Sequence, residues 1–224
     1  MDIYRLYLYS FLSLAFSYPT SELLEELEGG LPDLSLSLKA LGIEFDVRTI
    51  EEVIRTSKAR LLDLQGEFNA LFSTSLKAPA NETAYELEKA GRKASELADI
   101  EGFYRAFGVE VKPPYEPDSL VAELEFMALL LRKKLYAQEN GDRKALEVIN
   151  NALYSFFRDH LGRWYRLFTE ILKEQSEEEY YRVMGELLRA FLEKEREGVD
   201  GILDVKTYIK EVLEGSNWKC GGVS

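Results

Sequence analysis

The chain has 224 residues, a length that allows one large domain or two small ones. Its composition, 46% hydrophobic and 12% aromatic, is enough for a folded core and excludes a disordered or low-complexity protein. With 40 acidic and 28 basic side chains the formal net charge is -12, which repels a phosphate backbone and an anionic membrane surface, so neither nucleic-acid binding nor stable membrane insertion is predicted.

Cysteine and histidine counts exclude several classes of site. The chain has one cysteine, Cys220, and one histidine, His160, so it forms no intrachain disulfide and no Cys/His zinc cage. Glycine-rich phosphate loops, nucleophile elbows and dinucleotide fingerprints are also missing from the sequence. We therefore predict a protein that is not an enzyme, with no catalytic residue, no metal site and no cofactor.

Apolar residues recur at helical spacing along most of the chain, which predicts an all-α fold. The first helix is expected over residues 3–18 and ends before Pro19. This run lacks a basic n-region and contains Arg5, so it is interpreted as a buried helix and not as a signal peptide. No later stretch reaches the ~20 apolar residues needed to span a bilayer, which favours a cytoplasmic protein.

The next segments are expected to alternate between helix and loop. Thr20 or Ser21 caps a second helix that ends at Gly29. Residues 31–46 are predicted to be a loop with at most one helical turn. A long apolar stripe then predicts one continuous helix over residues 49–72.

A proline-rich connector divides the chain near its middle. Residues 73–81 are expected to form a loop, followed by a broken helical stretch that runs to Phe107. The sequence VEVKPPYEPDS comes next, and its prolines are expected to hold it extended and rigid. Asp118 can cap the following helix, whose broad apolar surface over residues 119–138 is typical of a central core helix.

Three further helices are predicted in the second half. The breaks between them are expected at 140–141, at 161–162 and before Ser176, which forms a capping box with Glu179. Residues 198–201 end the last of these helices.

The C-terminus is expected to hold a short helix from Asp204 to about Gly215, followed by a flexible tail in which Cys220 is an exposed thiol. No fixed-period repeat and no long linker is found. The whole chain, residues 1–224, is therefore predicted to be a single-domain multi-helix bundle with the proline-rich segment as an internal connector.

The connector also carries the best candidate for a binding site. Glu116 and Asp118 place two carboxylates beside Tyr115, an arrangement that can accept bidentate hydrogen bonds from arginine. A purely structural alternative is open, in which Asp118 caps the helix and Glu116 is solvated.

Several motifs in the same order resemble the TorD/DmsD/NarJ family of redox enzyme maturation chaperones. The resemblance is carried by EPDSLVAELEFMALLL, with FYRAFGVEV before it and FFRDHLGRWYRLF after it. The upstream segment EFNALFSTSLKAPANETAYEL and the first-helix ending FSYP also fit the family, so the motifs run from about Phe68 to Phe168. The sequence departs from the family where Asp118-Ser119 replaces the usual Asp-His.

The resemblance implies an all-helical cytoplasmic chaperone. Its partner would be the catalytic subunit of a molybdopterin oxidoreductase, recognised through an N-terminal twin-arginine leader or an equivalent segment before cofactor insertion and export. A twin-arginine leader offers two guanidinium groups beside an apolar run, which suits an apolar groove with an acidic rim. The oligomeric state is left open between a monomer and a swapped dimer.

The candidate peptide-binding residues fall into a polar group on and beside the connector and an apolar group in the helices. They are Tyr115, Glu116, Pro117, Asp118, Ser119, Glu123 and His160, together with Phe68, Leu71, Phe72, Tyr85, Phe126 and Trp164. Each aromatic residue can instead belong to the ordinary core, which is the favoured interpretation for Phe68, Phe126 and Trp164 taken singly. His160 is expected to cap helix carbonyls. At least one of Glu123 and Glu125 must reach solvent or a cationic partner.

Two other functions are weighed against the chaperone. A magnesium-dependent enzyme acting on a nucleotide or pterin precursor would use the clustered carboxylates, but only Lys112 lies near them to hold a phosphate. A permanent helical adaptor subunit would use the same groove without releasing its partner.

Overall fold

The structure, a computed structural model, describes residues 1–85 and 92–205. Its α-helices are α1 (Asp2–Ala15), α2 (Ser21–Gly29), α3 (Leu31–Leu41), α4 (Val47–Ala59), α5 (Leu61–Phe68), α6 (Arg92–Ala106), α7 (Leu120–Glu139), α8 (Arg143–Phe156), α9 (Gly162–Gln175) and α10 (Glu179–Arg196). Three short helical turns complete the set, namely η1 (Asn69–Ser73), η2 (Glu82–Tyr85) and η3 (Phe157–Leu161). The described residues contain no β-strand, so the prediction of an all-α fold is confirmed.

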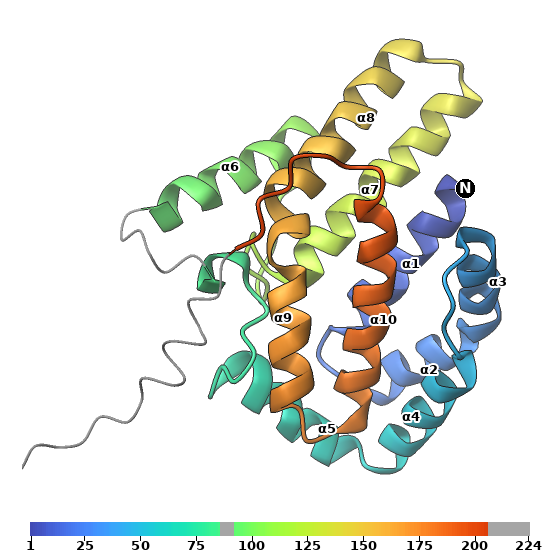
Figure 1. The fold of residues 1–224 in the computed structure, drawn as a ribbon, viewed down its shortest axis with the longest axis vertical. Coiled ribbons are helices and arrows are strands. Elements are labelled where there is room, and N and C mark those ends of the chain that lie inside the picture. The colour runs from blue at the N-terminus through green and yellow to red at the C-terminus, as the bar shows by residue number, and fades with distance from the viewer. Residues whose placement is uncertain (86–91, 206–224) are drawn as a thin grey trace, which may run out of the picture.

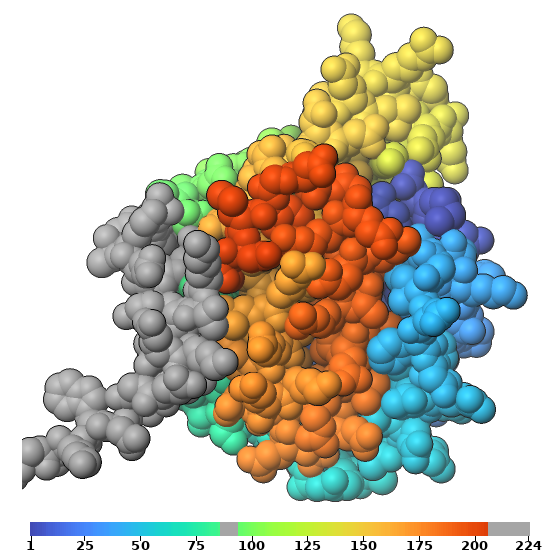
Figure 2. Space-filling view, in the orientation of Figure 1, coloured from blue at the N-terminus to red at the C-terminus, as the bar shows by residue number. Residues whose placement is uncertain are grey.

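Helices α1 and α7 form the centre of the arrangement (Figure 1). Helix α7 continues through a tight turn into α8, and α9 pairs with α10. Helices α2, α3 and α4 pack together beside α1, away from α8. The far ends of α7 and α8 project beyond the rest of the surface, as the space-filling view shows (Figure 2).

The core surrounds α7, as its broad apolar surface predicted. Leu124, Leu130 and Leu131 are fully buried, and Phe126 and Met127 are nearly so. Two predictions for α2 are also confirmed. Thr20 caps its start by accepting a hydrogen bond from the backbone N–H of Leu23, and the helix ends at the predicted glycines.

Residues 31–46 were expected to be a loop, and this is wrong, because α3 occupies most of the segment. Pro32 lies in the first turn of α3, where its missing N–H costs nothing. Leu34 and Leu38 point into the core. Gly42, with a φ of 68°, ends the helix in a left-handed conformation.

The single long helix expected over residues 49–72 is divided into α4, α5 and η1. Arg60, with φ -127° and ψ 39°, leaves the helical region between α4 and α5. Helix α4 also starts earlier than expected, at Val47, because Asp46 accepts a hydrogen bond from the backbone N–H of Arg48. The apolar stripe continues on both sides of Arg60, so the sequence pattern alone did not reveal the break between α4 and α5.

Two predicted boundaries in the second half are wrong. The chain does not break at 161–162, since α8 continues through the π-helical turn η3 directly into α9. Ser176 does not cap α10, whose N-cap is Glu178 without a side-chain hydrogen bond. The Oγ of Ser176 is buried with no hydrogen-bond partner in the part of the chain that is described.

The predicted last helix and tail, including Cys220, lie outside the described residues, apart from Asp204 and Val205. The single-domain organisation over 1–224 therefore stays a prediction. None of the helices in residues 1–85 and 92–205 is long and apolar enough to cross a membrane.

The π-helical turn η3 requires a glycine at its end. A Cβ added at Gly162 would overlap the backbone carbonyl oxygen of Phe157 and press against its ring, whereas a Cβ at Gly102 on α6 would meet nothing within 4 Å. We expect Gly162→Ala to lower the free energy of unfolding by about 1–3 kcal/mol through overpacking. Gly102→Ala should raise it by up to about 1 kcal/mol through helix propensity. Urea unfolding followed by circular dichroism measures both, and equal effects would contradict the packing role of Gly162.

Candidate functional site

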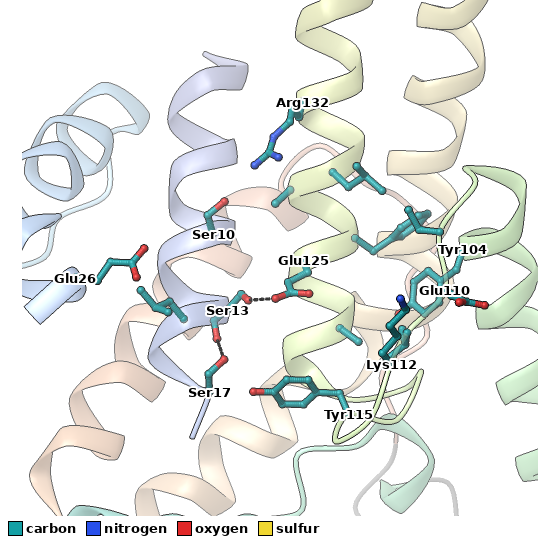
Figure 3. Close-up of a pocket in the computed structure, with 17 residues that line it drawn as sticks. Ser10, Ser13, Ser17, Glu26, Tyr104, Glu110, Lys112, Tyr115, Glu125 and Arg132 are labelled. Carbon is teal, nitrogen blue, oxygen red and sulfur yellow. Dashed lines mark hydrogen bonds between the residues drawn. The ribbon is translucent and has the colours of Figure 1, made fainter. Parts of the chain in front are cut away.

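A groove runs between α1, α7 and the connector, residues 109–119 (Figure 3). Its cavity volume is about 640 Å³. The residues that line it are Ser10, Ser13, Leu14, Ser17, Glu26, Tyr104, Val109, Glu110, Val111, Lys112, Tyr115, Ala122, Glu125, Phe126, Ala128, Leu129 and Arg132.

The floor of the groove is apolar. Phe126 packs edge-to-face against Tyr104, with ring centroids 4.8 Å apart, and both side chains are almost fully buried. Leu14 on α1 and Leu129 on α7 are only partly buried, so they present apolar surface to the groove. A floor of this kind can hold apolar side chains of a bound segment.

The rim carries three exposed carboxylates, those of Glu26, Glu110 and Glu125. Glu125 faces α1, where its Oε1 accepts a hydrogen bond from the hydroxyl of Ser13 at 3.4 Å (Figure 3). No ion pair within residues 1–85 and 92–205 involves any of the three carboxylates. Lys112 and Arg132 also line the groove, so its rim is mixed in charge with an acidic excess.

The connector was expected to be extended, but it folds through two turns. The backbone N–H of Tyr115 donates to the carbonyl oxygen of Lys112, and that of Ser119 donates to the carbonyl oxygen of Glu116. The hydroxyl of Tyr104 donates to the carbonyl oxygen of Pro117 at 2.7 Å. These bonds fix the connector against α6 and place the Tyr115 ring at the groove.

Asp118 is held inside the protein and does not cap α7. Its side chain is 2% exposed. One carboxylate oxygen accepts from the Asn81 amide at 3.1 Å, and the other accepts from the Thr83 backbone N–H at 3.1 Å and the Thr83 hydroxyl at 2.5 Å. The cap is Ser119, whose hydroxyl accepts from the backbone N–H of Ala122. The Asp118 carboxylate therefore accepts three hydrogen bonds from its own chain and does not line the groove.

The backbone reinforces this contact. The N–H of Glu82 donates to the carbonyl oxygen of Asp118, and the N–H of Leu120 donates to the carbonyl oxygen of Ala80, each at 2.9 Å. Asn81 and Ser119 thereby form an isolated antiparallel bridge. The segment before η2 is thus fixed to the start of α7, and the Glu82 side chain is directed into the core.

His160 lies at the inner end of this arrangement and does not cap a helix. Its Nδ1 is 3.1 Å from Oε2 of Glu82, and both side chains are 1% exposed. Burial by itself lowers the pKa of His160, but the hydrogen bond and negative charge of Glu82, with the negative charges of Asp99 and Glu96, raise the pKa above its ordinary value. The other Glu82 oxygen is 3.5 Å from the guanidinium of Arg163.

Glu123 is a second buried carboxylate on the inner face of α7. Its Oε2 accepts a hydrogen bond from the indole N–H of Trp164 at 3.1 Å, and its Oε1 has no hydrogen-bond partner among the residues described. Burial, together with the negative charge of Glu82, raises the pKa of Glu123 well above its ordinary value. The expectation that one of Glu123 and Glu125 reaches solvent is met by Glu125, which is exposed.

The predicted site residues do not gather in one place. Tyr115 and Phe126 line the groove, whereas Glu116 and Pro117 lie on the connector outside the lining. Asp118, Ser119, Glu123 and His160 are buried and do not line the groove. The remaining predicted residues lie away from the lining. Phe68 packs against Phe72, Phe72 packs against Tyr181, Leu71 is buried in the core, and Tyr85 stacks on Trp164.

Sequence reasoning missed the contribution of α1 to the groove. Ser10 and Ser13 interrupt the apolar sequence of α1, and Ser17 follows just beyond its end, at spacings of three and four that place the three residues on one side. That pattern was the available signal. Glu26 and Glu110 carried none, because nothing in their local sequence distinguishes them from ordinary solvated acids.

We expect Asp118→Ala to lower the free energy of unfolding by about 2–3 kcal/mol, because the Asn81 and Thr83 donors lose a charged acceptor. Glu116→Ala, which removes an exposed carboxylate on the same connector, should change it by less than about 0.5 kcal/mol. Urea unfolding checks both variants. Equal stabilities for the two would show that Asp118 is not a structural residue.

The raised pKa of Glu123 predicts a pH dependence of stability. Above the ordinary pKa of a glutamate, the folded chain keeps a proton that the unfolded chain has released, so the free energy of unfolding falls as pH rises. The loss is about 1.4 kcal/mol for each pH unit over which the proton is retained. Glu123→Gln should remove this loss and be more stable than wild type at pH 8. Urea unfolding between pH 4.5 and 8, with the exposed Glu125→Gln as control, tests it; parallel curves would contradict the assignment.

A search of curated proteins finds no match to the chain. Among solved structures, a chain from Archaeoglobus fulgidus described as a redox enzyme maturation protein is 22% identical, with 84% of this chain and 91% of that chain covered and a TM-score of 0.49. The family model for the nitrate reductase delta subunit matches residues 39–170, which is more than half of the chain. The protein therefore belongs to the nitrate reductase delta subunit family, which is NarJ/TorD-like, as the resemblance of its motifs predicted.

Proposed function

We propose that the chain acts in the cytoplasm as a binding protein without catalytic turnover. Its partner is the catalytic subunit of a molybdopterin oxidoreductase, bound through an N-terminal leader before cofactor insertion and export. Family membership supports the maturation role. The groove beside the connector supports the choice of a leader peptide as the ligand.

One observation carries this proposal: an apolar floor lies directly beside carboxylates that have no ion-pair partner in the described residues. A twin-arginine leader combines two guanidinium groups with an apolar segment, and this is the complementary pattern. A volume of about 640 Å³ accommodates a few side chains of an extended or helical segment, not a folded domain.

Different residues of the groove bind the polar and the apolar parts of the leader. Glu125, with Glu26 and Glu110 nearby on the rim, accepts hydrogen bonds from guanidinium groups, and a carboxylate can bind a guanidinium through two parallel bonds. Leu129 and Phe126 contact the apolar segment of the leader. Tyr115 offers both a ring and a hydroxyl beside α1 (Figure 3).

This assignment replaces Asp118 by Glu125 as the main arginine acceptor. Asp118 already accepts three hydrogen bonds from its own chain, so binding an arginine would require breaking them. Glu125 has only a long contact with Ser13 to exchange. Exchange of a weak contact for a charged hydrogen bond favours binding.

We expect Glu125→Gln to weaken leader binding by about 1.5–3 kcal/mol, which is roughly tenfold to a hundredfold in Kd. Glu116→Gln is the matched control, because it removes an exposed carboxylate that lies outside the groove lining, and it should leave Kd unchanged. Isothermal titration calorimetry would use the twin-arginine leaders of molybdoenzymes from the same organism. A lysine-for-arginine leader should bind the wild type more weakly.

Three results would overturn the proposal: no binding of any leader, equal losses in the two variants, or a loss in Glu116→Gln alone. A permanent adaptor is distinguished by copurification. A chaperone leaves its partner once the partner is folded, so this chain should be absent from the mature oxidoreductase, whereas an adaptor would remain with it.

A further inference from the structure

A second polar site lies away from the groove, between η2, η3 and α6. It contains His160 on η3, Glu82 on η2, and Glu96 and Asp99 on α6. One ligand atom from each of Glu82, Glu96 and His160 lies within 4.8 Å of the others. Asp99 Oδ2 is 3.3 Å from Nε2 of His160.

The two ring nitrogens of His160 have different surroundings. Nδ1 makes a hydrogen bond with Glu82 Oε2, as described above. Nε2 is buried and has no hydrogen-bond partner in the described part of the chain, although Asp99 Oδ2 is close. The 3.3 Å between Nε2 and Asp99 Oδ2 is short enough for a hydrogen bond, but the angle between the two groups does not allow one. Nε2 is thus a buried polar atom that lies close to the Asp99 carboxylate without a hydrogen bond to it.

A separation of 3.3 Å between His160 Nε2 and Asp99 Oδ2, without a hydrogen bond, is typical of two ligand atoms that bind the same metal ion. Ligands of one tetrahedral zinc ion, each about 2.0–2.1 Å from the metal, lie roughly 3.3 Å apart and point at the ion and not at each other. A histidine that binds a metal through one ring nitrogen usually donates the other N–H to a carboxylate, which fixes the ring. Glu82 occupies that position relative to His160.

Helix α6 supplies the carboxylates in a suitable arrangement. Glu96 and Asp99 are three residues apart and therefore lie on the same face of the helix. Glu96 is half-buried, whereas the side chain of Asp99 is 66% exposed, so the outer end of the site is open to solvent while its inner end is enclosed.

We propose that His160 Nε2, Glu96 and Asp99 bind a divalent transition-metal ion such as Zn²⁺, with Glu82 orienting the imidazole through Nδ1. The single histidine excludes a histidine-rich cage but not a site with one imidazole and two carboxylates, to which water adds the remaining ligand. The bound ion ties α6 to η3. The Arg163 guanidinium lies on the far side of Glu82, where it offsets the charge of that carboxylate.

The test uses the full chain without a histidine tag, stripped with a chelator and titrated with ZnCl₂ by calorimetry. We expect one ion per chain and at least a tenfold weaker Kd in Glu96→Gln and in Asp99→Asn. Glu101→Gln is the matched control on the same helix, since Glu101 pairs with Arg105 outside the site. Its Kd should equal that of the wild type.

The single histidine gives a second, independent readout. In ¹⁵N spectra of the imidazole, Zn²⁺ should shift the Nε2 signal of His160 more strongly than the Nδ1 signal, which stays hydrogen-bonded to Glu82. The proposal fails if no ion binds, if all three variants bind as the wild type does, or if Zn²⁺ leaves Nε2 unchanged. Equal binding in all variants would indicate adsorption to the acidic surface. An unchanged Nε2 would identify His160 and Glu82 as a purely structural pair.

Discussion

The buried carboxylate of Asp118 fixes the relation between the two halves of the chain. It accepts hydrogen bonds from Asn81 and Thr83, and the backbone bonds of Glu82 and Leu120 run beside it. A carboxylate that is 2% exposed is unfavourable unless donors surround it. The loop that supplies those donors must therefore stay against the start of α7, and this places η2 in the core.

The position of η2 explains the buried polar residues in an otherwise apolar interior. Glu82 reaches His160 and Arg163, and Glu123 reaches Trp164. Removing one member of such a set leaves another buried and unsatisfied, so the set specifies one packing arrangement more than it adds stability. Burial, with the negative charge of Glu82, raises the pKa of Glu123, and the hydrogen bond and charge of Glu82 raise the pKa of His160 against the effect of its burial.

Helix α7 serves two surfaces at once. Its inner face carries Glu123 among buried leucines, and two residues later Glu125 stands exposed at the groove. The connector that leads into α7 is fixed by Asp118 on one side and by the Tyr104 hydroxyl on the other. The shape of the groove thus depends on the same contacts that close the core, and Tyr104 both lines the groove and holds the connector.

The sequence by itself determined the helical class, the central place of α7 and the family, because helical periodicity and an ordered set of motifs are local properties of the chain. It did not determine which acid of the connector region faces solvent. Asp118 and Glu116 are both acidic residues of the same connector, and only the fold brings the Asn81 and Thr83 donors to Asp118. The same holds for Arg60, where an unbroken apolar stripe hides a change of helix direction. Burial and partner choice depend on residues distant in the chain, so tertiary structure alone decided them.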